Sequence, residues 1–180
     1  AARLGDRLTA VGKAIERQQM VADRNEDLDV FGVAEDDLEA AVQVFHVRRG
    51  RVVGRKGFVV DKVEDLTPAE LAGRILEGFY DEPPPIGMPK QVLVQREPDD
   101  LDLYQRWLSG LRGSAVTIRV PQRGDKRSLQ ETVARNAREE LVRHRLKRAS
   151  DHNSRARALN ELQDLLGLPE SPLRIECFDM

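Results

Sequence analysis

The chain has 180 residues, with 29 lysines and arginines against 31 aspartates and glutamates, so its formal net charge is -2. A chain of this length can bury a hydrophobic core, and its nearly balanced charge excludes a polycation that binds nucleic acid through net charge alone. The single cysteine, Cys177, excludes an intrachain disulfide and a cysteine-based metal cluster. No apolar run reaches the length of a membrane span and no signal-peptide pattern is present, which favours a cytoplasmic protein without a membrane partner.

Residues 1–24 are expected to form a helical extension. Four apolar residues recur there at helical spacing: Leu4, Leu8, Val11 and Ile15. Gly5 and Gly12 each weaken such a helix by about 1 kcal/mol relative to alanine, which indicates that the helix depends on a partner or on residues upstream of it. The apolar face is therefore a candidate partner-binding surface, and packing against the chain's own domain is the alternative.

Three strands are predicted next, over residues 28–34, 38–48 and 51–63. The middle run is apolar on both faces, which is typical of a strand that is covered on both sides. Arg49-Gly50 predicts a hairpin turn between the second and third strands. We interpret His46 as a core or edge histidine rather than a metal ligand, because no second histidine or cysteine lies at a metal-site spacing from it.

Helices and short strands then alternate. Thr67-Pro68-Ala69-Glu70 predicts a capping box at the start of a helix that ends before the prolines at 83–85. A strand over 91–95, an amphipathic helix through 103–111 and a strand over 116–120 follow. Two further helices are predicted, the first over 128–149 and the second over 154–166, ended by Gly167 and Pro169.

This order predicts an α/β fold with a mixed sheet of about five strands, flanking helices and helical extensions at both ends. The first three strands should form an antiparallel meander, and the later strands, joined by helical crossovers, should be parallel. Such an order resembles RNase H-like domains. We assign this central domain to residues 25–150, and residues 151–180 to a helix and strand that lead into a following domain.

Nucleases of the RNase H-like class hold two divalent ions with several carboxylates. Asp179, at the end of the terminal strand, is placed like the first of these carboxylates, so it is the candidate catalytic and metal-binding residue of an incomplete set. Aligning residues 29–34 with 175–180 puts Val33 where Asp179 stands, and the fourth strand ends in Gln95 instead of a second carboxylate. The central domain is therefore predicted to be a catalytically degenerate scaffold. A metal site made by Asp36, Asp37 and Glu39 is the alternative, although three acids in a turn more commonly form a solvated loop.

The helix over 128–149 and the turn before it are rich in bases. Six of them are candidate DNA-binding residues: Arg123, Lys126, Arg127, Arg138, Arg145 and Arg148. At 100° per residue, Arg127, Arg138 and Arg145 project within about 20° of one another, which suits a phosphate track. Aromatic residues do not interleave with these bases, so we expect backbone contacts and no base stacking. The alternative is a solvated face balanced by pairs such as Glu131 with Arg135.

Several segments together resemble one family: Val120-Pro-Gln-Arg-Gly-Asp-Lys126, Asn136-Ala137, Leu168-Pro169, Ile175-Glu-Cys-Phe-Asp179, Glu35-Asp-Asp37 and Gly57-Phe58. Over the whole chain they resemble the UvrC family, the incision subunit of bacterial nucleotide excision repair. The resemblance implies a metal-dependent DNA endonuclease that cuts damaged double-stranded DNA on both sides of a lesion. It also implies UvrB as partner, Mg²⁺ or Mn²⁺ as cofactor of the intact protein, and no cofactor in this region.

Under this resemblance, residues 1–24 are the end of a UvrB-binding helical segment, and the chain is a piece of a longer protein. The leading hypothesis is a docking and DNA-positioning region that is inactive by itself. The second is a module that binds UvrB through the N-terminal helix and the acidic segment 23–39, without a direct role in DNA binding. The third is a spacer that sets the distance between two nuclease centres.

Overall fold

The computed structural model describes residues 26–62, 65–170 and 172. Within them it contains strands β1 (Leu28–Glu35), β2 (Glu39–Arg48), β3 (Arg51–Asp61), β4 (Gln91–Leu93) and β5 (Thr117–Arg119). The helices are α2 (Pro68–Tyr80), α3 (Leu101–Arg112) and α4 (Gly124–Leu166). The predicted N-terminal helix and Asp179 lie outside the described residues, so the predictions made for them stay predictions.

The five strands form one mixed sheet in the order β3-β2-β1-β4-β5. β1 pairs antiparallel with β2, and β2 pairs antiparallel with β3. On its other side β1 pairs parallel with β4, and β4 pairs parallel with β5. The predicted combination of an antiparallel meander and parallel later strands is therefore confirmed.

The turn between β2 and β3 lies at Arg49-Gly50, as the sequence predicts. Both residues have positive φ angles, 51° and 71°. Two successive positive φ angles define the two-residue turn whose twist matches that of antiparallel strands. Glycine adopts this conformation without steric cost, and the arginine before it is the one non-glycine residue with positive φ in the part of the chain that the structure describes.

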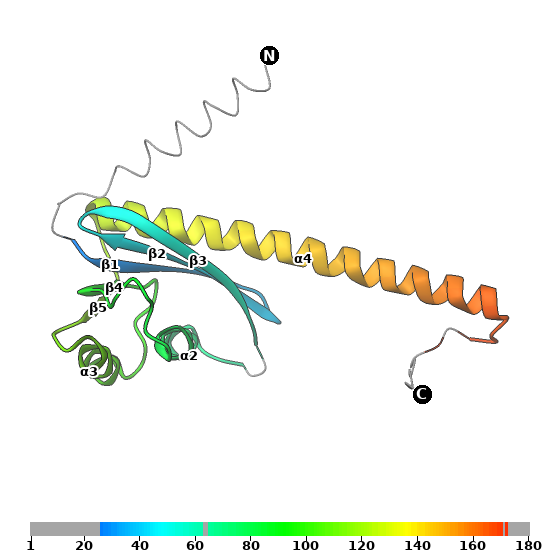
Figure 1. Cartoon of the computed structure of the whole chain (residues 1–180), viewed down its shortest axis with the longest axis horizontal. Helices are drawn as coiled ribbons and strands as arrows, with labels where there is room; N and C mark the ends of the chain where they lie inside the picture. Colours follow the sequence, from blue (N-terminus) through cyan, green and yellow to red (C-terminus); the bar gives the residue numbers. More distant parts are fainter. Residues whose placement is uncertain (1–25, 63–64, 171, 173–180) are drawn as a thin grey trace, which may run out of the picture. The chain divides into compact units, whose positions relative to one another are not determined.

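Helices α2 and α3 cover one face of the sheet (Figure 1). Thr67 and Glu70 form the predicted capping box at the start of α2, in which each side chain binds the backbone N–H of the other residue. The core on this face joins β1, β2, β4 and β5 to α2 and α3, and its largest fully buried members include Tyr80, Phe31 and Leu108. Burying such a side chain contributes roughly 1.5–3 kcal/mol, so this layer holds the helices in place.

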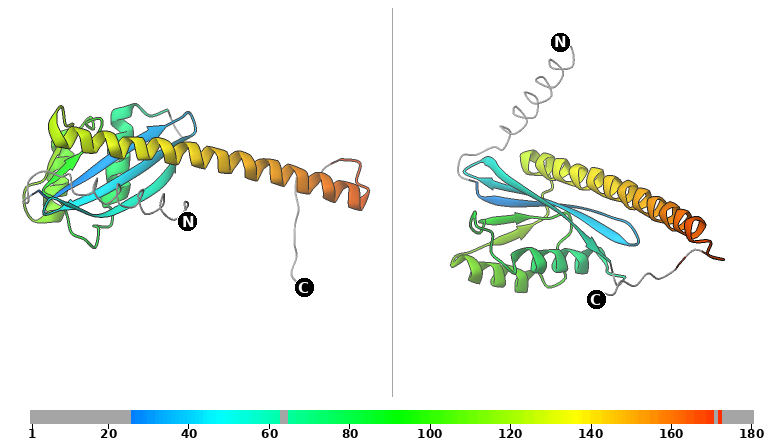
Figure 2. Two further views of the ribbon diagram at one scale, coloured as in Figure 1. Left: turned by 90° about the horizontal axis from the view of Figure 1, so that it is seen from above. Right: turned by 45° about the vertical axis from the view of Figure 1, so that its right-hand side comes forward.

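The first part of α4 covers the opposite face of the sheet (Figure 2). A smaller core lies there, in which Val133 of α4 packs against residues of β1, β2 and β4 such as Val30 and Phe45. Gly32 of β1 has α4 directly above it, since a Cβ at this position would lie 2.6 Å from the backbone nitrogen of Ala134. The glycine is thus required by the close approach of the helix backbone. β2 is covered on both faces, as predicted, with Val42 and Val44 facing one core and Phe45 and Val47 the other.

The prediction of two separate helices over 128–149 and 154–166 is wrong, because α4 is one helix of 43 residues. The residues between the predicted helices, Ser150 to Asn153, have low helix propensity. They cost only a few tenths of a kcal/mol each and include no glycine or proline, so the helix continues through them. The chain divides into two compact units after Leu141, and the second begins at Val142 within α4. Among the described residues, no helix combines the length and apolar character needed to cross a membrane.

Candidate functional site

A cavity of about 270 Å³ lies beside the ends of the parallel strands β1 and β4. Phe31, Val33 and Glu35 contribute from β1, and Val94, Gln95 and Arg96 contribute from the segment after β4. The predicted strand over 91–95 is too long, since β4 ends at Leu93 and Gln95 lies beyond it. Helix α2 supplies the apolar wall, with Leu71, Ile75 and Leu76 among its members. Ligands bind at the carboxyl ends of adjacent parallel strands in sheets of this kind, so this cavity is a candidate ligand-binding site.

Val33 and Gln95, which the sequence singles out as the replaced carboxylate positions, lie together at this cavity. The backbone N–H of Val33 donates a hydrogen bond to Oε1 of Gln95. The valine side chain offers no ligand atom, and the Gln95 oxygen is already engaged. Glu35 is the acid that lines the cavity, and it is paired with Nζ of Lys62 at 2.9 Å.

The described residues do not fit the divalent ions that RNase H-like nucleases use. A pair of such ions needs several carboxylates converging on one point. Around this cavity one carboxylate is present, and nowhere in residues 26–62, 65–170 and 172 do three or more histidine, cysteine, aspartate or glutamate side chains come together as a metal site. The chemistry of phosphodiester cleavage therefore cannot be assigned to the described side chains.

The alternative metal site at Asp36, Asp37 and Glu39 does not form either. Oδ1 of Asp36 accepts hydrogen bonds from the backbone N–H groups of Leu38 and Glu39, both at 2.9 Å. Asp36 thus closes the turn between β1 and β2, while Glu39 is buried at the start of β2 and Asp37 is exposed. A turn stabilised by an aspartate side chain accounts for these acids.

The candidate DNA-binding bases in the first unit are engaged to different degrees. Nζ of Lys126 lies 2.8 Å from a carboxylate oxygen of Glu26 and donates a hydrogen bond to Oε1 of Gln91 at 2.8 Å. Nε of Arg127 lies 2.7 Å from Glu131, so this glutamate pairs with Arg127 and not with the expected Arg135. Arg123 and Arg138 are exposed. Lys126 therefore joins the start of α4 to the sheet domain, whereas Arg138 presents its guanidinium to solvent.

The second unit carries the densest run of bases. Arg145 and Arg148 are exposed on α4, together with Lys147 and Arg155. A shallow groove of about 300 Å³ on this unit is lined by six side chains that repeat at helical spacing: His144, Lys147, Arg148, Asp151, His152 and Arg155. One acid among these six leaves the surface positive, as a phosphate-binding surface requires.

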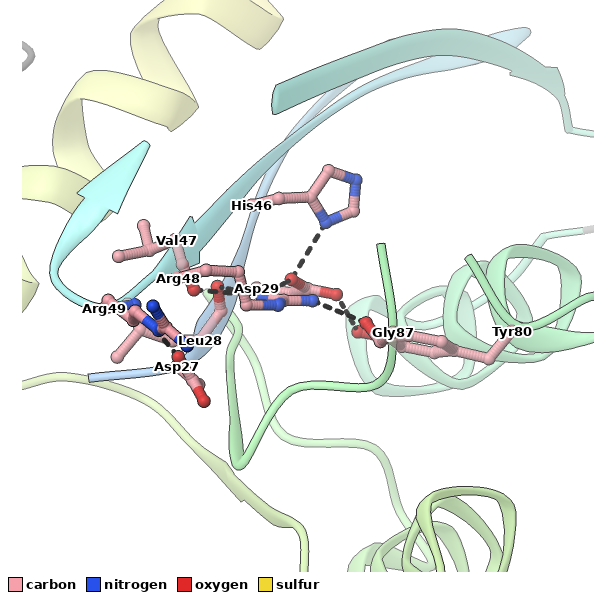
Figure 3. A network of polar contacts seen from close by, with 9 residues as sticks. All are labelled: Asp27, Leu28, Asp29, His46, Val47, Arg48, Arg49, Tyr80 and Gly87. Atoms are coloured by element: carbon pink, nitrogen blue, oxygen red, sulfur yellow. Dashed lines mark hydrogen bonds and ion pairs between the residues drawn. The ribbon is translucent and has the colours of Figure 1, made fainter. Parts of the chain in front are cut away.

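A buried polar network joins β1, β2 and α2, and the sequence analysis did not identify it. Asp29, with 0% of its surface exposed, accepts three hydrogen bonds at its carboxylate. They come from Nδ1 of His46 at 2.9 Å, from an Nη atom of Arg48 at 2.8 Å and from the hydroxyl of Tyr80 at 2.8 Å (Figure 3). Arg48 continues the network to the carbonyl oxygen of Gly87 at 2.7 Å. Three elements of the fold thus meet at one satisfied carboxylate.

This network is structural, because its members point to one another inside the core. Burial, and then the charge of Asp29, raises the pKa of Tyr80 well above its ordinary value of 10, so the phenol is a permanent donor at neutral pH. His46 is the predicted core histidine, and its ring also lies 5.9 Å from that of Phe79. The signal for this network was available in the pairing of Asp29 with His46 across β1 and β2.

A mixed sheet in this strand order, with helices on both faces, defines an RNase H-like domain, here without a metal-binding carboxylate set among the described residues. Comparison with known families agrees: the model described as "UvrC Ribonuclease H-like domain" matches residues 27–144. The chain belongs to the UvrC family.

Curated relatives extend this match to the whole chain. It is 52% identical over 180 residues to "UvrABC system protein C" of Streptomyces avermitilis, covering 100% of the chain and 26% of that protein. The corresponding proteins of Thermobifida fusca and Mycolicibacterium paratuberculosis are each 50% identical, again over 100% of the chain and over 28% and 30% of their own lengths. The chain thus spans about a quarter of the length of these relatives.

Among solved structures, the catalytic domain of human Endonuclease V aligns with 49% of the chain and 46% of its own length, at 17% identity and a TM-score of 0.28. Both values are too low for this likeness to bear on fold or function.

Proposed function

We propose that this chain is the central docking and DNA-positioning region of an incision subunit of nucleotide excision repair. The intact protein would be a metal-dependent endonuclease that cuts damaged double-stranded DNA and works with UvrB. The observation that carries the proposal is the identity of about one half, along the entire chain, to proteins named UvrABC system protein C.

The region itself would have no complete active site. Support comes from the contact between Val33 and Gln95, which occupies the place where carboxylates are needed, and from the pairing of the nearby Glu35 with Lys62. Mg²⁺ or Mn²⁺ in the intact protein would depend on Asp179 together with carboxylates outside this region. The isolated chain should show no incision of a bubble DNA with Mg²⁺ or Mn²⁺. Cutting that Asp179→Ala abolishes would contradict this part of the proposal.

The positioning role would fall to the exposed bases of α4. Arg138 in the first unit, and Arg145 and Arg148 in the second, are on the surface of this helix. Backbone phosphates would bind there without sequence preference, because these bases have no interleaved aromatic residue for stacking. Lys126 and Arg127 would contribute less than Arg138, since DNA would first have to break their pairs with Glu26 and Glu131.

Docking through the acidic segment is less favoured by the geometry. Asp29 and Glu39 are buried, and Glu26 and Glu35 are in ion pairs with Lys126 and Lys62. This leaves few free acids on segment 26–39 for a basic partner. Binding of UvrB would then depend on the apolar residues of the predicted N-terminal helix, Leu4, Leu8, Val11 and Ile15, which lie outside the described residues.

A salt titration of DNA binding tests the positioning role. Binding of the chain to undamaged duplex and to bubble DNA would be measured for the wild type and for Arg138→Glu combined with Arg148→Glu. The matched control is Arg106→Glu combined with Arg119→Glu, which changes the charge equally at exposed positions away from α4. We expect the α4 double variant to bind DNA more than tenfold more weakly than the wild type does. The slope of log affinity against log salt concentration should decrease by the equivalent of about two phosphate contacts.

If both double variants weaken DNA binding equally, the effect reflects net charge, and the proposal that the bases of α4 bind phosphates is wrong. If the wild type does not bind DNA at all, the region is a protein-docking scaffold and contacts with DNA belong to other parts of the protein.

A further inference from the structure

Strand β3 is the edge of the sheet beyond β2. It is 11 residues long, and within the described residues no strand pairs with its outer edge. Proteins commonly interrupt a long edge with a proline, yet β3 contains none. Its one irregularity is a register shift opposite His46 and Val47, which leaves the segment from Arg55 to Asp61 regularly paired with β2.

The direction of the free backbone groups follows from the pairing. The N–H of Lys62 donates to the carbonyl oxygen of Leu38 at 2.7 Å, so the amide of Lys62 faces β2. Amides alternate in direction along a strand, and those of Lys56, Phe58 and Val60 therefore also face β2. The N–H and C=O groups of four residues then point outward: Arg55, Gly57, Val59 and Asp61.

A groove of about 510 Å³ runs beside this edge, between β3 and α2. Phe58 and Val60 line it from the strand, and Leu71, Ile75 and Gly78 line it from the helix. Gly78 has no atom within 4 Å of the position where a Cβ would stand, so its side of the groove is open. An edge strand next to an apolar groove is the arrangement by which domains bind an extended peptide as an additional strand.

The charge around the groove selects among possible occupants. Lys56 and Arg74 are exposed here, with Nζ of Lys56 lying 5.1 Å from the centre of the Phe79 ring. Asp61 is the acid that lines the groove, and the positive charge of Lys62 is paired with Glu35. An acidic peptide would complement Lys56 and Arg74.

We propose that β3 and the groove beside it bind an extended segment of a partner protein, which adds to the sheet as a sixth strand next to the outward groups of residues 55–61. One apolar side chain of the peptide enters the groove against Ile75 and Gly78, and its acidic side chains on the same face lie beside Lys56 and Arg74. This site shares Leu71 and Ile75 of α2 with the cavity beside β1 and β4, and it does not depend on DNA binding.

The test uses a short fluorescent peptide in which a glutamate stands two residues before and two residues after a central leucine, with valine between them, so that these side chains share one face of the strand. An analogue has lysine at both glutamate positions. Fluorescence anisotropy with the full chain should detect binding of the acidic peptide and not of the basic one. Hydrogen exchange should slow at the amides of Arg55, Gly57, Val59 and Asp61. Exchange at the amides that face β2 should change less.

Two variants separate backbone pairing from groove filling. Val59→Pro removes an outward N–H and no bond to β2, and Val59→Thr is its control because it keeps the N–H in a side chain of the same shape. Gly78→Leu fills the groove from a position with open space. Gly110→Leu is its control, because Gly110 of α3 is also helical with open space around it but does not line the groove.

We expect Val59→Pro and Gly78→Leu each to weaken peptide binding at least tenfold, with both controls near the wild type. If the acidic peptide does not bind at millimolar concentration, or binds both variants as well as it binds the wild type, the proposal is overturned. A concentration-dependent dimer that Val59→Pro disrupts would also overturn it and assign the edge to a second copy of the chain. Competition by single-stranded DNA for the same amides would assign the edge to nucleic acid instead.

Discussion

The hydroxyl of Tyr80 donates a hydrogen bond to the carboxylate of Asp29 across 2.8 Å, and neither residue exposes any surface to solvent. Tyr80 is the last residue of α2 and Asp29 is the second residue of β1, so this bond ties the helix to the central strand of the sheet. A buried carboxylate is tolerated only when its partners satisfy it. The same contact gives two of the predictions below.

Tyr80→Phe should lower the free energy of unfolding by about 2 kcal/mol, because it removes a hydrogen bond to a charged and buried acceptor. Urea denaturation at neutral pH measures this. Tyr104→Phe is the matched control, since it removes a 2.7 Å hydrogen bond to Glu77 that is exposed. The control should cost less than about 1 kcal/mol. Equal losses in the two variants would contradict the role assigned to Asp29.

Alkaline pH should destabilise the fold through Tyr80. Its pKa in the folded state is raised, chiefly by burial, whereas in the unfolded chain the phenol ionises near pH 10. Above that pH the unfolded state loses a proton that the folded state keeps, so the stabilising contribution of the neutral phenol is lost as pH rises. The stability difference between the wild type and Tyr80→Phe should therefore be constant below about pH 10 and shrink between about pH 10 and 12.

Tyr104 must be removed to isolate this effect. Partial burial and the hydrogen bond to Glu77 raise the pKa of Tyr104 to about 12, so it contributes a pH dependence of the same sign. The comparison is best made in the Tyr104→Phe background, by urea denaturation at each pH. A difference that stays constant across this range would show that Tyr80 is not the group involved.

Gly32→Ala should destabilise the protein by about 2–4 kcal/mol, because the added methyl group would collide with the backbone of α4 at Val133 and Ala134. A helix backbone cannot move aside as a flexible side chain can. Gly78→Ala in α2, where the space is open, should instead stabilise by about 0.5–1 kcal/mol. Thermal or urea unfolding of both variants checks the sign. A neutral Gly32→Ala would mean that α4 lies farther from β1.

Lys126→Gln and Arg138→Gln remove equal charge from α4 and should differ in effect. Lys126 is held by Glu26 and Gln91, so its loss should reduce stability by about 0.5–1 kcal/mol and change DNA affinity little. Arg138 is exposed, so its loss should leave stability nearly unchanged and reduce the salt slope of DNA binding by about one contact. Unfolding and salt titration of both variants are needed. If Lys126→Gln weakened DNA binding more than Arg138→Gln did, the DNA contact would lie at the start of α4.

The sequence predicted the sheet well because its signals are local. Alternation, the turn residues Arg49-Gly50 and the capping box at Thr67 each act within a few residues, and the structure confirms all three. The continuity of α4 was missed because Ser150, Asp151 and Asn153 are typical of helix starts, and only the absence of glycine and proline argues that the helix goes on.

The pairing of distant residues was harder to predict. The sequence placed Val33 and Gln95 at corresponding positions of two strands, and the structure brings them into contact. The ion pair of Lys126 with Glu26 depends on how α4 packs on the sheet, and the hydrogen bond from Tyr80 to Asp29 depends on how α2 packs on it. Charge patterns within one segment carry no information about such packing, so acids and bases that look solvated in the sequence are paired in the fold.

The contact between Gln95 and Val33 also limits how a pair of carboxylates could be introduced at these two positions. Gln95→Glu would retain an acceptor for the Val33 N–H, but a single carboxylate holds no metal pair. An acid introduced first at Val33 would lie beside Phe31 and Ile75 at the cavity, where an unpaired charge is destabilising. Changing Gln95 alone therefore gains no metal site, and changing Val33 alone costs stability. Only the two substitutions together would provide two carboxylates. One backbone hydrogen bond and one apolar wall thus oppose the stepwise introduction of a carboxylate pair at these two positions.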